Sequence, residues 1–158
     1  ATARLAHLLG MQVQYVSPGD KAVDFAKRVS LNECLATSDV ISLHCPLTPE
    51  THHLLDHEAF SQMKNNAIVI NAARGAVVDE PALADAIISG KIAGAAIDVL
   101  PQEPPAKDSP LMMLASQTNV ILTPHIAWAS QQAMQSLADQ LIDNIEAFQT
   151  GKPRNRVA

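Results

Sequence analysis

The stretch Ala67-Ile-Val-Ile-Asn71-Ala-Ala-Arg74-Gly75 joins a short apolar run to an arginine and a glycine. Two further apolar runs end in a similar way. Residues 92–98 end in the carboxylate of Asp98, and residues 120–122 are followed by Thr-Pro-His125. Short apolar runs that alternate with helical patterns are typical of a parallel α/β sheet. Ligands bind outside the carboxyl ends of the strands in such a sheet. We therefore expect the polar residues at these three run ends to face one crevice.

Arg74, Glu103 and His125 are side chains that suit chemistry on a small anionic carbonyl compound. An arginine can hold a carboxylate with two parallel hydrogen bonds. A histidine can donate or accept a proton near neutral pH, and a glutamate behind it can fix its tautomer. Gly75 permits a sharp turn or a close approach to a ligand, and Pro124 gives His125 a rigid platform. Each residue alone would more often be structural, but together they predict an active site.

At these residues the sequence resembles the D-2-hydroxyacid dehydrogenase family. Its motif His125-Ile-Ala-Trp128-Ala-Ser is most similar to the glycerate dehydrogenase and hydroxypyruvate reductase members. The resemblance runs from Arg4 to Pro153 and so covers almost the whole chain. It implies an NAD(P)-dependent oxidoreductase that reduces a small 2-keto acid, such as hydroxypyruvate or glyoxylate, to the D-2-hydroxy acid.

The resemblance also implies a role for each site residue. Arg74 would hold the substrate carboxylate, His125 would protonate the substrate carbonyl, and Glu103 would hydrogen-bond the other ring nitrogen of the histidine. Asp98 would face the nicotinamide carboxamide, and Trp128 would line the substrate pocket beside Arg74 and His125. The full set expected at the cofactor is Ser17, Cys45, Pro46, Thr51, Ala72, Arg74, Asp98, His125 and Ala127.

Ser17 bears on the choice of cofactor. It lies seven positions after Gly10, where many NAD-using members of the family have an acidic residue for the adenosine ribose. A serine does not repel a 2′-phosphate, and Lys21 is near enough in sequence to attract one. Both NAD and NADP therefore remain open as cofactors, with a lean toward NADP being accepted.

The cysteines and the spaced histidines give no sign of a metal or disulfide. Cys34 and Cys45 form no C-x-x-C pattern, and free cysteines of this kind are usually small buried thiols. His53 and His57 are four apart, but a helix start at Asp56 falls between them and no further ligand is in view. No metal site is expected.

The rest of the pattern alternates strands with helices. Strands are expected at 11–16, 40–44, 67–71, 92–98 and 119–122. Helices are expected at 3–9, 31–36, 56–63, 79–90 and 130–149, with a proline-rich loop at 101–110. This order predicts an α/β fold, a Rossmann-like doubly wound parallel sheet.

The sequence predicts that residues 1–158 are one partial dinucleotide-binding domain, a length suited to a single core. The first residues already read as the helix that should follow a G-x-G-x-x-G turn. By comparison with the family, we expect that glycine loop and the first strand to precede Ala1. The family's substrate domain is expected to be largely absent from the chain.

Composition narrows the choice of partners. The formal net charge is −5 with no basic cluster, which argues against nucleic acid or an anionic membrane as partner. No apolar run approaches the ~20 residues that a membrane helix needs, and no basic-then-apolar leader opens the chain. A cytoplasmic protein is the default expectation. The partners expected are a small 2-keto or 2-hydroxy acid and, when the protein is full length, a second copy in a homodimer.

Three other functions can be compared with the same motifs. Phosphoglycerate dehydrogenase fits the motifs, but many of those enzymes carry an extra regulatory domain beyond the point where this chain ends. Formate dehydrogenase fits poorly because that group has glutamine where Glu103 stands. A nucleotide-sensing scaffold, like the family's transcriptional corepressors, shares the full set of arginine, glutamate and histidine and stays open.

Overall fold

The computed structural model describes residues 1–19 and 22–156, so Lys21 lies outside the described residues. The chain divides into two compact units, Ala1–Leu122 and Thr123–Ala158, and each is described here by itself.

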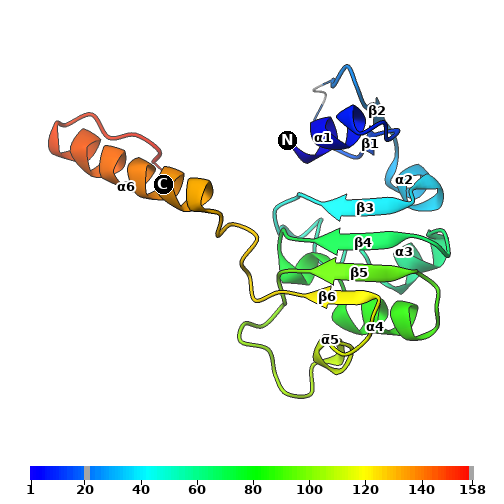
Figure 1. The fold of residues 1–158 in the computed structure, drawn as a ribbon. Helices are drawn as coiled ribbons and strands as arrows, with labels where there is room; N and C mark the ends of the chain where they lie inside the picture. The colour runs from blue at the N-terminus through cyan, green and yellow to red at the C-terminus, as the bar shows by residue number, and fades with distance from the viewer. Residues whose placement is uncertain (20–21, 157–158) are drawn as a thin grey trace. The chain divides into compact units, whose positions relative to one another are not determined.

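The first unit contains two parallel sheets (Figure 1). The larger sheet has the order β3-β4-β5-β6, and the smaller one pairs β1 with β2. Every strand pair is parallel, which confirms the predicted sheet type. The strands are β1 (Gln14–Tyr15), β2 (Lys27–Arg28), β3 (Val40–Leu43), β4 (Ile68–Asn71), β5 (Gly94–Ile97) and β6 (Val120–Leu122).

The helices connect these strands in the order that the sequence predicts. They are α1 (Thr2–Leu8), α2 (Leu31–Thr37), α3 (His57–Gln62), the 3₁₀ helix η1 (Gly75–Val77), α4 (Glu80–Ile88) and α5 (Pro110–Met113). The second unit contains α6 (Gln131–Gln149). Among the described residues, no helix is both long and apolar enough to cross a membrane.

The core of the first unit lies between one face of the larger sheet and its helices. Ile41 of β3, Val69 of β4 and Ile97 of β5 are buried on this face. Phe60 of α3 and Leu83 of α4 belong to the same core. Figure 1 shows α3 and α4 behind the sheet. Each such side chain contributes roughly 1.5–3 kcal/mol when it leaves water. The opposite face is more open.

Short polar residues cap α2 and α3, and a glycine follows α1. The Asp56 carboxylate accepts a hydrogen bond from the Ala59 N–H at 2.9 Å, and the Ser30 hydroxyl caps α2 in the same way. Gly10 follows α1 with φ +87°, and its N–H donates to the carbonyl of His7 at 2.9 Å. Glycine reaches this left-handed backbone without steric cost. The sequence predicted both the Asp56 cap and the Gly10 stop.

Three predicted strands are one residue shorter than expected, and two are shorter by more than one residue. Residues 11–16 form only the two-residue β1, and β5 begins at Gly94 rather than at residue 92. The N–H groups of Lys91 and Ile92 both donate to the carbonyl of Ala86, at 2.8 and 3.2 Å. These two residues therefore complete the end of α4 before the strand starts. The elements β2, η1 and α5 were not predicted.

Candidate active site

The loops that follow three neighbouring strands lie together at the carboxyl ends of the strands, called the carboxyl edge of the larger sheet. Because β3, β4 and β5 are parallel, their carboxyl ends lie on the same side, as the arrowheads in Figure 1 show. Arg74 follows β4, Asp98 follows β5, and Cys45 and Pro46 follow β3. The structure thus brings these four predicted site residues to a common edge.

Asn71, the last residue of β4, shapes the loop that carries Arg74. Its side chain is 1% exposed. Its Oδ1 accepts a hydrogen bond from the Ala73 N–H, and its Nδ2 donates to the Arg74 carbonyl, each at 3.0 Å. Its own carbonyl accepts from the Asp98 N–H at 2.9 Å. One buried amide therefore sets the Arg74 loop and ties it to the end of β5. No role was predicted for Asn71, although a polar residue at the end of an apolar run is a signal that the sequence offers.

Arg74 itself has an extended backbone and an exposed side chain. Its Nη1 donates to the Ala73 carbonyl at 2.6 Å. A guanidinium has five N–H donors in a fixed fork, so this contact leaves capacity for a bidentate grip on a carboxylate.

Gly75 lies in direct backbone contact with the loop that follows β5. A Cβ at this position would lie 2.0 Å from the carbonyl carbon of Leu100 and 2.3 Å from the nitrogen of Pro101. Only glycine leaves room for a backbone this close. The chain after β5 must therefore pass against the residue that follows Arg74.

Glu103 lies in that second loop and is exposed. Its Oε1 accepts a hydrogen bond from the Leu100 N–H at 2.9 Å, which closes a compact turn. Asp98, at the start of the same connection, is 7% exposed. A buried carboxylate and an exposed one therefore occupy the loop that Gly75 holds beside Arg74.

The loop after β3 is held by Thr51, a predicted cofactor residue. The Thr51 hydroxyl donates to the Pro46 carbonyl and accepts from the Thr48 N–H, both at 2.7 Å. A hydrogen bond from the Thr48 side chain lowers the pKa of the neighbouring Glu50. Cys45 is half-buried and packs against the core. This loop is ordered by its own polar contacts.

Ser17 lies two residues after the short β1, where the adenosine end of a dinucleotide was predicted to bind. Its carbonyl accepts a hydrogen bond from Nη2 of Arg28 at 2.8 Å. From the sequence, Lys21 was the cation expected near Ser17. The structure adds Arg28, because the parallel pairing of Tyr15 with Arg28 brings together residues that are far apart in the sequence.

His125 belongs to the second unit, whereas Arg74 and Glu103 belong to the first. Its φ of +54° is unusual for a residue with a side chain. Its N–H donates to the Thr123 carbonyl at 3.0 Å, and its own carbonyl accepts from Nε1 of Trp128 at 2.8 Å. Strained backbone of this kind costs about 1–3 kcal/mol and gathers at functional sites. The pairing of Glu103 with His125 stays a prediction, as do the roles of Ala127 and Trp128.

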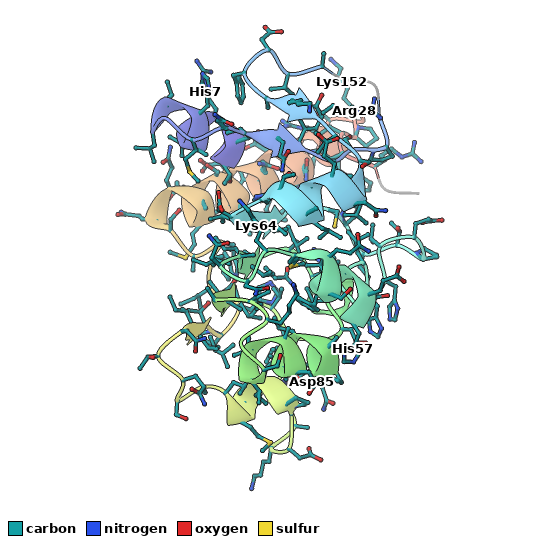
Figure 2. The ribbon with its side chains drawn as sticks, turned by 90° about the vertical axis from the view of Figure 1, so that its right-hand side faces the viewer. His7, Arg28, His57, Lys64, Asp85 and Lys152 are labelled. Atoms are coloured by element: carbon teal, nitrogen blue, oxygen red, sulfur yellow. The ribbon has the colours of Figure 1, made fainter. Side chains whose placement is uncertain are left out.

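Two of the other histidines, His53 and His57, each lie near a carboxylate. His53 Nδ1 lies 4.0 Å from Asp79, and His57 Nε2 lies 4.0 Å from Asp85. Figure 2 shows the second pair side by side between α3 and α4. Across residues 1–19 and 22–156, no three histidine, cysteine or acidic side chains are grouped to hold a metal.

Comparison with known proteins identifies the kind of domain that this edge belongs to. Residues 1–127 match the family model "D-isomer specific 2-hydroxyacid dehydrogenase, NAD binding domain". A glycerate dehydrogenase of Methylorubrum extorquens is 51% identical over 98% of this chain and 48% of its own length. A hydroxypyruvate reductase of Blautia hydrogenotrophica is 40% identical over 99% of this chain and 49% of its own.

A solved structure gives the same result for the fold. An acyclic imino acid reductase in complex with NADPH and D-Arg superposes with a TM-score of 0.88 at 35% identity, over 99% of this chain and 49% of that one. The chain therefore spans about half the length of the relatives that it matches. The family expected from the motifs is confirmed, and so is a Rossmann-like parallel α/β fold.

Proposed function

This chain belongs to the D-isomer specific 2-hydroxyacid dehydrogenase family, and we propose that it is the NAD-binding part of an enzyme that reduces a small 2-keto acid. Hydroxypyruvate and glyoxylate are the substrates we favour, with the D-2-hydroxy acid as product. The single observation that carries the proposal is the backbone contact at Gly75, which holds the Arg74 and Glu103 loops together at the carboxyl edge of the sheet. The names of the most similar relatives support the substrate class.

The sheet edge fits a nicotinamide dinucleotide. Ala72 is small and exposed where β4 ends, so a flat ring can approach the backbone there. Asp98 offers a carboxylate at the next strand end, where it would accept hydrogen bonds from the carboxamide. When bound, the cofactor supplies the hydride.

In the mechanism that we propose, the residues of this chain bind, orient and protonate the substrate. Arg74 holds its carboxylate in a two-pronged hydrogen bond, which points the keto group at the cofactor site. The imidazolium of His125 donates a proton to the carbonyl oxygen and becomes a neutral imidazole, while Glu103 holds its other ring nitrogen. Trp128 steadies the histidine backbone through its bond to the His125 carbonyl.

For the cofactor, the proposal includes both NAD and NADP. The family description names NAD, and the similar imino acid reductase carries NADPH. Ser17 adds no negative charge at the adenosine end, and the Arg28 guanidinium lies 2.8 Å from its carbonyl. A cation at this place favours acceptance of a 2′-phosphate.

We further propose that the complete enzyme is a cytoplasmic homodimer. Cys34 and Cys45 are free thiols, as is usual in reducing compartments. Leu5, Leu8 and Leu9 of the α1 segment are 62%, 71% and 83% exposed, an apolar surface that another part of the protein or a second copy would cover.

Substrate turnover tests the proposal. "Complete enzyme" here means this chain together with the half that its relatives carry in addition. Oxidation of NADH and NADPH by the complete enzyme is measured with hydroxypyruvate, glyoxylate, pyruvate and a phosphorylated 2-keto acid. We expect hydroxypyruvate or glyoxylate to give the highest kcat/KM. Tight NADH binding without turnover of any keto acid would instead favour the nucleotide-sensing scaffold.

A further inference from the structure

The loop that carries Glu103 is fastened at its far end by a residue with no predicted role. Glu80 begins α4, and its Oε1 accepts hydrogen bonds from the hydroxyl of Ser109 and from the N–H of Leu111, the latter at 3.2 Å. Ser109 is 9% exposed and Glu80 is half-buried, so this contact is partly shielded from water. A hydrogen bond to a charged carboxylate is among the stronger ones in proteins.

The near end of the same loop is fastened by Gly75, only five residues before Glu80. Its Cα lies against the backbone of Leu100 and Pro101, as the 2.0 Å clash of an added Cβ shows. Both fastening points therefore belong to the one segment that follows Arg74. Between them lies a small cavity lined by Asn71, Gly75, Glu80, Ile97, Pro101 and Leu111. The residues from Pro101 to Ser109 span the distance between the two points, and Glu103 is among them.

We propose that Glu80 is a positioning residue that sets the place of Glu103 relative to Arg74. This inference rests on the proposed function, because it gives Glu103 a catalytic role. The Glu80 carboxylate does not touch substrate or cofactor. It acts by holding the Ser109 end of the loop, while Gly75 fixes the Leu100 end. A catalytic group displaced by about 1 Å can lose on the order of a hundred-fold in rate.

The experiment compares Glu80→Ala with Glu80→Gln in the complete enzyme, using NADH and hydroxypyruvate or glyoxylate, whichever the wild type turns over. Glu80→Ala removes the acceptor, and we expect kcat to fall roughly ten- to hundred-fold while the KM for NADH stays close to wild type. Glu80→Gln keeps an acceptor oxygen and should recover most of the lost kcat. Asp85→Asn is the matched control, because Asp85 lies on the exposed side of the same helix and should leave kcat unchanged.

A double-mutant comparison with Glu103 distinguishes a positioning role of Glu80 from a purely structural one. In a Glu103→Gln background, Glu80→Ala should change kcat by no more than about three-fold, because the group that it positions is already altered. An equal loss of kcat in both backgrounds would overturn the inference, and so would wild-type kcat in Glu80→Ala. If Glu80→Ala does not fold, Ser109→Ala removes one of the two bonds and should show the same coupling on a smaller scale. Lack of turnover by the wild-type enzyme would instead count against the proposed function.

Discussion

At the residue scale, the site depends on residues that position the loops around Arg74 and Glu103. Asn71 uses both ends of its amide on the Arg74 loop, and Gly75 uses the absence of a side chain. The sequence pattern predicted where Arg74 and Asp98 would lie, because each follows an apolar run. It could not show that Glu80 meets Ser109, since contacts between residues 29 positions apart leave no mark on local periodicity.

Gly75→Ala should be strongly destabilising. The added methyl would lie 2.0 Å from the Leu100 carbonyl carbon, and backbone cannot move aside as a flexible side chain can. We expect a loss of about 3 kcal/mol or more in the free energy of unfolding, measured by denaturant titration of the complete enzyme. Gly19→Ala is the control, because its Cβ would meet nothing closer than 4.0 Å. Equal stability of the two variants would mean that the Gly75 contact is wrong.

Arg74→Ala should raise the KM for the keto acid and also lower kcat. A carboxylate clamp both binds and orients the substrate, so its loss weakens the ground state and the transition state together. Steady-state kinetics of the complete enzyme provide the measurement. Arg74→Lys keeps the charge but loses the two-pronged geometry, so its kcat and KM should lie between those of the wild type and of Arg74→Ala. Kinetics like those of the wild type in Arg74→Ala would remove Arg74 from the site.

At the element scale, the strands and helix caps were predictable where pattern and capping residue agreed. The apolar runs coincide with β3, β4 and β6. Helix α3 starts after Asp56, whose side chain caps it. The misses have physical causes. β2 consists of Lys27 and Arg28, which carry no apolar signal, and it exists because β1 offers it a partner. Ile92 was expected to begin a strand, but its N–H donates to the Ala86 carbonyl of α4.

Asp56→Ala tests the capping argument. The Asp56 carboxylate accepts from the Ala59 N–H at 2.9 Å, and loss of such a cap typically costs about 0.5–2 kcal/mol. Asp79 stands at the same position of α4 but makes no side-chain cap bond. We therefore expect Asp79→Ala to lower the midpoint of thermal unfolding less than Asp56→Ala does. The reverse order would contradict the cap assignment.

At the scale of the whole molecule, the 158-residue sequence contains catalytic candidates but no G-x-G-x-x-G turn. Among the described residues, β1 and β3 are edge strands of separate parallel sheets. Backbone N–H groups at a helix N-terminus are what usually bind the two phosphates of a dinucleotide. The family is evident from the sequence because its motifs are local. The arrangement of Glu103 with His125 is not, because the two residues belong to different units.

The 158-residue polypeptide on its own should therefore bind NADH and NADPH very weakly and show no turnover. Its exposed strand edges should also favour self-association. Calorimetric titration with NADH, set beside the same titration of the complete enzyme, measures the difference. Micromolar binding by the polypeptide alone would show that the phosphate site is not where we place it.

Under the proposed function, Arg74, Glu103 and His125 act in one catalytic set, with His125 as the proton donor. The most direct test is kcat for keto-acid reduction by the complete enzyme carrying His125→Gln. General acid catalysis contributes roughly 10²–10⁴-fold, so we expect kcat to fall by that order while the KM for NADH changes little. A kcat equal to that of the wild type would contradict the claim.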